Sequence, residues 1–495
     1  MVKMYPLLMP YKATSEDPFD HIKAAHLLNR AGFGGKPEEI EKVLDLGPEK
    51  AVDWLMDFPD AGVDEQTQTD VPDLSSLEGY PKNFAEIRQM TKGKTPEERK
   101  EFQKKLMAAN RDAILQTVKW WMNRMTFGPT PLQEKLTLFW HGHFTSSARD
   151  EKAAILMWNQ NELLRRNAAG NFRDFVRQIS RDPAMLDFLN NAQNRKEHPN
   201  ENYARELMEL FTLGIGNYTE NDIKQAARAF TGWAHDGDEF LFRKFEHDEG
   251  EKVFFGRRGN LNGDDIIDII LAHPACAKYI TGKLFKYFAY EDPEPQLVEA
   301  LGQQLHENNW NLRPIIRTIL TSKAFYSKTA IGTQIKSPIQ LVVGSIRLLG
   351  LEKSPDARVL GNALNQMGQV PLAPPNVKGW PGGRLWINTS TLFVRYNTIS
   401  WMAGGSMPAL AGGKIGKGIS LLVRKVPSGG THFEPKGDGS PEEAVDEWLW
   451  RLVQRPVEES RKQILVEVID GKPQSEEKLR KMIQLIVSMP EYQLC

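Results

Sequence analysis

The sequence is poor in cysteine, the residue that disulfide frameworks and many structural zinc sites require. Only Cys276 and Cys495 occur among 495 residues, and they lie far apart. This scarcity excludes a disulfide framework and any cysteine-rich zinc site. A bound metal ion would therefore have to use histidine, carboxylate or asparagine side chains.

An excess of charge of one sign is also missing. The 63 lysine and arginine residues nearly balance the 64 aspartate and glutamate residues, and both signs are interspersed along the chain. No strong net field exists to attract nucleic acid or an anionic membrane. We therefore expect no nucleic-acid partner.

The first residues lack a long apolar run. Residues 1–13 contain two prolines and no apolar core, unlike a secretory signal or a membrane anchor. We expect no membrane insertion and, by default, a cytoplasmic location. A leader ahead of this sequence would instead make the protein periplasmic.

Several common catalytic signatures are absent as well. The sequence has no HExxH run, no nucleophile elbow, no phosphate-binding loop and no dinucleotide fingerprint. These absences exclude many frequent enzyme classes. Any catalytic site must be built from another combination of residues.

Helical periodicity dominates what is present, for example over residues 96–127 and 150–167. It predicts an all-α fold with a large multi-helix domain, a small β-hairpin near 239–256 and a C-terminal helical segment. The main domain is expected at 15–403, with a Pro-, Gly- and Ser-rich loop or lid near 72–94. A Gly-rich linker over 404–439 would lead to helices over 440–495 that pack on the main domain.

The most informative segment is 138–147, where His141 and His143 stand one residue apart among aromatic residues. Pro131 follows Thr130 as the first residue of an apolar helix, which Gly142 interrupts. Both imidazoles therefore fall at the end of a buried helix and could serve as metal ligands. Alternatively, His143 is a hydrogen-bonded core histidine and His141 caps carbonyl groups.

A second segment, 198–214, predicts a helix that starts after Asn200 and ends before Gly214. A rotation of about 100° per residue places Arg205, Glu206 and Glu209 on its polar face. If this face is solvated, Arg205 forms an ordinary ion pair with Glu209. If it is covered, the charges form a network that holds the fold together or positions a substrate.

Further ligand candidates, His247 and Asp248, lie on the turn of the predicted hairpin. Together with His141, His143 and one carboxylate of the second segment, they would suit zinc, iron or manganese. The sequence thus predicts one divalent or transition metal ion.

A third segment, 373–391, is a proline-stiffened loop that contains two tryptophans and several polar residues. Trp380 and Trp386 would stack on a sugar or a cation, and Arg384 would bind a carboxylate, sulfate or phosphate, with Lys378 and Asn388 beside them. Alternatively, the tryptophans fill a gap between helices, and Asn388 caps the helix that follows.

These segments occur in a recognisable order. With the opening motif HLLNRAGFG, the chain resembles the bacterial "domain of unknown function 1800" family from about residue 20 to its end. The motifs are found at 26–34, 140–144, 200–214, 230–233 and 374–388. The resemblance implies no catalytic residues, because the family has no established activity. Many members are encoded beside a protein that looks like alkaline phosphatases and sulfatases, which implies a shared pathway or a complex.

We derive two hypotheses. The first is a metal-assisted enzyme, hydrolytic or oxidative, that acts on a polar substrate of anionic or carbohydrate-like character. Its catalytic residues would be Glu206, Glu209 and Arg205, and the loop 373–391 would bind the substrate. The second is a non-catalytic helical scaffold that binds a phosphatase- or sulfatase-like partner and uses the histidines as buried polar glue.

Overall fold

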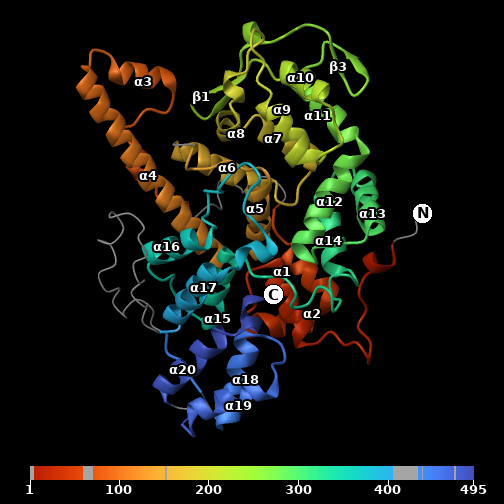
Figure 1. Cartoon of the computed structure of the whole chain (residues 1–495), viewed down its shortest axis with the longest axis vertical. Coiled ribbons are helices and arrows are strands. Elements are labelled where there is room, and N and C mark those ends of the chain that lie inside the picture. Colours follow the sequence, from red (N-terminus) through yellow and green to blue (C-terminus); the bar gives the residue numbers. More distant parts are fainter. Residues whose placement is uncertain (1–4, 60–70, 151–152, 405–432, 438, 473–474) are drawn as a thin grey trace.

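The computed structural model describes residues 5–59, 71–150, 153–404, 433–437, 439–472 and 475–495. Helices dominate these residues, so the predicted all-α fold is confirmed (Figure 1). The helices of the first half are α1 (His21–Ala31), α2 (Pro37–Leu55), α3 (Phe84–Thr91), α4 (Pro96–Phe127), α5 (Pro131–His143), α6 (Ala154–Arg166), α7 (Phe172–Ser180), α8 (Pro183–Phe188), α9 (Asn202–Glu206) and α10 (Glu220–Ala229).

Local chemistry explains many of the helix ends. Proline occupies the first turn of α5, and Thr95 forms a capping box with Glu98 at the start of α4.

The helices of the second half are α11 (Gly263–Ala272), α12 (Pro274–Phe288), α13 (Pro295–Glu307), α14 (Leu312–Thr321), α15 (Pro338–Leu349), α16 (Ala357–Met367), α17 (Thr389–Met402), α18 (Pro441–Leu452), α19 (Glu459–Ile469) and α20 (Glu476–Val487).

Strands occur in the predicted region, but they pair differently from one hairpin over 239–256. Strand β1 (Trp233–Asp236) pairs with β2 (Glu239–Phe242), and β3 (Lys252–Phe254) pairs with β4 (Arg257–Gly259), both antiparallel. Two-residue loops that contain positive φ angles close both hairpins, at Gly237 and at Phe255-Gly256. Because each strand finds its partner across a tight turn, β2 and β3 do not pair with each other.

The predicted loop or lid near 72–94 contains a helix. Asn83 accepts a hydrogen bond from the backbone N–H of Glu86 and caps α3 there. Figure 1 shows α3 beside the first half of α4, where both project from the body of the molecule. The predicted glycine-rich linker lies mostly at 405–432, outside the described residues.

The buried apolar residues form two clusters. One combines α1, α2 and α5–α14, and the other combines the second half of α4 with α15–α20. Helices α18 and α20 contact α15 and α17, so the residues after 440 share their core with helices that precede 404. Helix α5 contributes to both clusters, through Leu136 to the first and Leu138 to the second. It lies near the middle of the molecule (Figure 1).

Candidate functional site

Helix α5 is buried along nearly its whole length, yet it carries charges of opposite sign on neighbouring positions. Glu134 is 0% exposed and Lys135 is 3% exposed. A rotation of about 100° between them sends the two side chains to different surroundings. The carboxylate joins a paired network, whereas the ammonium group meets a cavity.

The network around Glu134 ties α4, α5 and α6 together. One carboxylate oxygen accepts hydrogen bonds from Arg124 and Arg165 at 2.6 and 2.8 Å, and the other accepts them from the indole of Trp121 at 2.9 Å and from Arg165 at 3.0 Å. Burial alone would raise the pKa of Glu134, but Arg165 and Arg124 outweigh it and hold the pKa below its ordinary value. This ionised, fully paired group has a structural role.

On the other side of α5 lies a cavity of about 400 Å³, which we call the basic cavity. Among its described lining residues, five cationic side chains face one carboxylate, that of Glu291. The cationic residues come from α1, α5, α12 and the loop before α17: Arg30, Lys135, Lys283, Lys286 and Lys378.

Lys135 has the most unusual environment of these residues. Its Nζ has no hydrogen-bond or salt-bridge partner among the described residues; it lies 5.1 Å from the ring centre of Phe33 and 5.7 Å from that of Tyr287. Burial lowers the pKa of Lys135 to about 7; the charge of Cys495 acts in the opposite direction, and the nearby charges of Arg30 and Lys336 add to the lowering. A buried amine that no carboxylate side chain pairs with among the described residues thus lines the cavity.

Two further cations of the cavity, Arg30 and Lys283, involve α12: the first contacts its C-terminal end, and the second is one of its residues. Arg30 donates hydrogen bonds to the carbonyl oxygens of Phe288, at 2.8 Å, and Ala289, where α12 ends. These carbonyls lie at the negative end of the helix dipole. Lys283 projects over the ring of Tyr279 at 5.2 Å, and burial lowers the pKa of Lys283 to about 8.

The two predicted ligand histidines have different surroundings. The Nε2 of His143 lies 3.0 Å from the carbonyl oxygen of Phe211, and its ring stacks on Phe139 while lining the basic cavity. This environment matches the core-histidine alternative. His141 lies against Trp121 and Trp380, and burial lowers its pKa to about 3. Neither of its ring nitrogens has a hydrogen-bond partner among the described residues, so it caps no carbonyl group there.

The second predicted segment, 198–214, contacts the histidine-containing segment 138–147 through its backbone carbonyl groups. Helix α9 continues as a π-helix over Leu207–Thr212, an irregularity that often marks functional sites. Its carbonyls at Leu210 and Phe211 are engaged by the Tyr279 hydroxyl, which donates at 2.9 Å, and by His143. The irregular turn therefore attaches this segment to α5 and α12.

The polar side chains of this segment point elsewhere. Arg205 forms salt bridges with Glu220 and Glu201 at 2.9 and 3.2 Å, so the predicted pair with Glu209 is wrong. Glu209 instead accepts a hydrogen bond from the Tyr218 hydroxyl at 2.8 Å. Burial and the charge of Glu209 raise the pKa of half-buried Glu206. None of the three predicted catalytic residues lines the basic cavity.

The predicted metal-ligand set is not assembled. The Nδ1 of His247 lies 2.8 Å from the carbonyl oxygen of Thr231, and Asp248 forms a salt bridge with Arg228 at 2.7 Å. Within the described ranges, no group of three or more His, Cys, Asp and Glu side chains could hold a metal ion. His247 and Asp248 are instead directed to partners near their own element, and His143 contacts a carbonyl oxygen of the π-helix.

The loop 373–391 lies against the end of α5. Lys378, Trp380 and Trp386 line the basic cavity, as expected for a ligand-binding loop. Arg384 is exposed and does not line the cavity, and Asn388 accepts a hydrogen bond from the backbone N–H of Thr391 to cap α17. The capping alternative therefore holds for Asn388.

Close backbone contact between two glycines fixes this loop. Gly379 has φ +83°, and a Cβ atom there would overlap the carbonyl oxygen of Gly142. We expect Gly379→Ala to lower the free energy of unfolding by about 1–2 kcal/mol, because it adds backbone strain and separates the loop from α5. Chemical denaturation would measure the change. Gly382→Ala, which meets open space at φ −123°, is the control, and equal losses would contradict the expectation.

Sequence reasoning missed Arg30, Lys135 and Lys283. A signal was present for Lys135, since residues 135, 138, 139, 142 and 143 share one helical face and all line the cavity. Lys135 was not singled out because the apolar positions of this helix, Leu132, Leu136, Phe139 and Trp140, share only Phe139 with that face. Arg30 lies within the opening motif, but only the tertiary contact with α12 gives it a place in the site.

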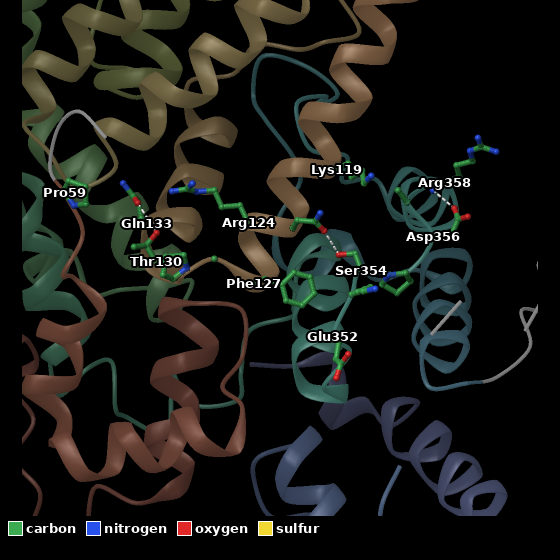
Figure 2. A pocket seen from close by; sticks show the side chains of 16 residues that line it. Pro59, Lys119, Arg124, Phe127, Thr130, Gln133, Glu352, Ser354, Asp356 and Arg358 are labelled. Atoms are coloured by element: carbon green, nitrogen blue, oxygen red, sulfur yellow. Dashed lines mark hydrogen bonds between the residues drawn. The ribbon is translucent and has the colours of Figure 1, made fainter. Parts of the chain in front are cut away.

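A wider hollow of about 1180 Å³ lies near the start of α5, between α4 and α16 (Figure 2). Its polar groups are largely engaged: Ser354 donates to the side-chain oxygen of Asn123 at 2.6 Å, and Asp356 caps α16. Acidic and basic side chains both line it, and Arg124 among them is paired with Glu134. The basic cavity therefore has the larger unmatched charge.

None of the helices in the described part of the chain is both long enough and apolar enough to cross a membrane. No curated protein and no solved structure matches the chain. A family model described as "Protein of unknown function (DUF1800)" matches residues 26–494. That match begins at the first residue of the opening motif and extends over nearly the whole sequence, so the chain belongs to the DUF1800 family.

Proposed function

We propose that this protein binds a small anionic ligand in the basic cavity. The observation that carries the proposal is the charge of the lining, in which five cationic side chains face one carboxylate. Buried cations are normally paired, and the buried Arg30 and Lys135 of this lining form no salt bridge with a carboxylate side chain among the described residues. An anion would supply the missing counter-charge.

The electrostatics favour such a ligand. Lys135 and Lys283 have lowered pKa values because burial disfavours their charged forms. An anion bound at Lys283 and Lys378 would restore the charge of Lys283 and accept charge-assisted hydrogen bonds in a region of low dielectric constant. Binding should therefore be coupled to proton uptake near neutral pH.

The walls of the cavity restrict the rest of the ligand. The lining also contains the apolar and aromatic side chains of Trp380, Trp386, Leu138 and Phe139. Cavities of this kind select ligands with one charged group and a flat or apolar remainder. A carboxylate, sulfate or phosphate attached to a ring would match both parts of the lining.

Titration calorimetry with sulfate and benzenesulfonate tests the proposal, because neither anion changes charge between pH 6 and pH 9. We expect benzenesulfonate to bind more tightly, and Lys283→Gln or Lys378→Gln to weaken binding about tenfold each, or about 1.4 kcal/mol. Affinity should fall as the pH rises through 7 and 8, since Lys135 and Lys283 lose their protons there.

The matched control is Lys481→Gln, which removes an exposed lysine of α20 that does not line the cavity. It should leave the affinity unchanged. Absence of binding by both anions, or equal losses in all three variants, would refute the proposal. Metal-assisted catalysis and docking of a phosphatase- or sulfatase-like partner stay predictions from the sequence.

A further inference from the structure

We infer that Lys135 is a reactive amine that forms an imine with a carbonyl-bearing carboxylate, such as a 2-oxo acid, bound in the basic cavity. The inference rests on the proposed anion-binding function and adds the chemistry of the ligand. It assigns to Lys135 a covalent role that an ordinary lysine of an anion site lacks.

The geometry separates Lys135 from the other lysines of the cavity. It is 3% exposed, has no hydrogen-bond or salt-bridge partner among the described residues, and projects from a buried helix, whereas Lys286 and Lys378 are exposed. The titratable groups that act on it come from three segments: Arg30 of α1 and Lys336 before α15 disfavour its charge, and Cys495 favours it but is outweighed by burial. None of them is a carboxylate side chain that would fix the ammonium form.

This environment favours the form of lysine that can react. An amine attacks a carbonyl only when its lone pair is free, and burial beside other cations is a recognised way to activate a lysine. With its pKa lowered to about 7, a large fraction of Lys135 is unprotonated at neutral pH, unlike a surface lysine with an ordinary pKa of 10.5. The aromatic rings of Phe33 and Tyr287 add to the desolvation.

The reaction needs no oxidant or reductant. The Nζ lone pair forms a bond to the ligand's carbonyl carbon, the C=O π electrons move to oxygen, and a proton passes from nitrogen to that oxygen. Loss of the resulting hydroxyl as water, after protonation, leaves a C=N bond. Amine and carbonyl thus give imine and water, while the carboxylate of the ligand remains free to bind the other cations.

The same cavity explains why a 2-oxo acid is the fitting class. The carboxylate would bind Lys283 or Lys378, and the adjacent carbonyl would then face the unpaired amine. The tryptophan walls would accept the apolar remainder. Phenylpyruvate has all three features, and pyruvate has the first two.

Reductive trapping of the full chain tests the inference. We would incubate the protein with pyruvate or phenylpyruvate and cyanoborohydride, which supplies hydride to the imine carbon, and locate the adduct by intact-mass and peptide mass spectrometry. We expect one adduct, on Lys135, with a rate that rises with pH through about 7. Lys135→Met should abolish it, Lys481→Met should retain it, and sulfate should slow it in the unmodified protein.

The outcomes separate the inference from the proposed function. Sulfate binding without an adduct on Lys135, or labelling spread evenly over exposed lysines, would overturn the inference and leave anion binding intact. Labelling of Lys135 that sulfate does not slow would retain the reactive amine and refute the anion site. The sulfate competition uses unmodified protein, so it decides the question even if Lys135→Met fails to fold.

Discussion

Replacing Glu134 by alanine is expected to lower the free energy of unfolding by about 3–5 kcal/mol, the largest effect of any substitution considered for this protein. The carboxylate is fully buried and accepts hydrogen bonds from Arg124, Arg165 and Trp121. Its removal leaves the fully buried guanidinium of Arg165 with less than its full set of partners. An under-paired buried charge costs more than the original pair contributed.

Chemical denaturation monitored by circular dichroism would measure this loss. Glu134→Gln keeps the shape and some hydrogen bonds, so we expect a smaller loss, and Glu467→Ala removes an exposed carboxylate of α19 as the control. A loss for Glu134→Ala no larger than that of the control would show that the network contributes little to stability.

The network also predicts how stability depends on acidity. The pKa of Glu134 is lower in the folded protein than its ordinary value of 4.5. Its contribution is therefore fully present above the ordinary value and is lost as the pH falls through the folded-state value. Glu134→Gln should remove this part of the acid sensitivity.

Replacing Lys135 by methionine is expected to raise the free energy of unfolding by about 1–3 kcal/mol at pH 6. The side chain is buried, and the charge of Cys495 only partly offsets the cost of burial, so the charged form of Lys135 is costly in the folded state. Methionine has a similar length and no charge, and it is surrounded here by the rings of Phe33 and Tyr287. A residue whose replacement stabilises the fold while abolishing ligand chemistry is typical of a functional site.

The direction in which the stability gain of Lys135→Met changes with pH tests whether the burial of a charged amine causes it. Between a folded-state pKa of about 7 and the ordinary value of 10.5, the unfolded chain binds more protons at this residue than the folded one does. The stability contribution of Lys135 therefore improves as the pH rises through that range, and the advantage of methionine shrinks. Unfolding free energies at pH 6 and pH 9 would measure this. An equal gain at both values, or a loss at pH 6, would contradict it.

Part of the site could be predicted because its signals are local. The proline at the start of α5 and the glycine near its end set the bounds of that helix, and His143 was placed correctly at its last turn. The same holds for the loop 373–391, where Asn388 caps the next helix. Capping, turn geometry and helical periodicity depend on residues a few positions apart.

The rest depends on contacts between distant segments. His247 and Asp248 were natural ligand candidates by residue type. In the fold, however, His247 contacts the carbonyl oxygen of Thr231, and Asp248 forms a salt bridge with Arg228. The strands of the 239–256 region were recognised, yet β2 pairs with β1, which lies before that region, and β3 pairs with β4, which lies after it. Residue chemistry alone does not say which side chain reaches which partner.

The sequence by itself determined the helical architecture and the segments that gather at the centre, because apolar periodicity and helix-end chemistry act within a few residues. Only the tertiary structure decided that Lys135 and Arg30 share a cavity with the tryptophan loop, while Glu206 and Glu209 do not line it. The reason is physical: burial and the proximity of other charges fix the protonation and reactivity of a side chain, and both arise only when distant elements pack together.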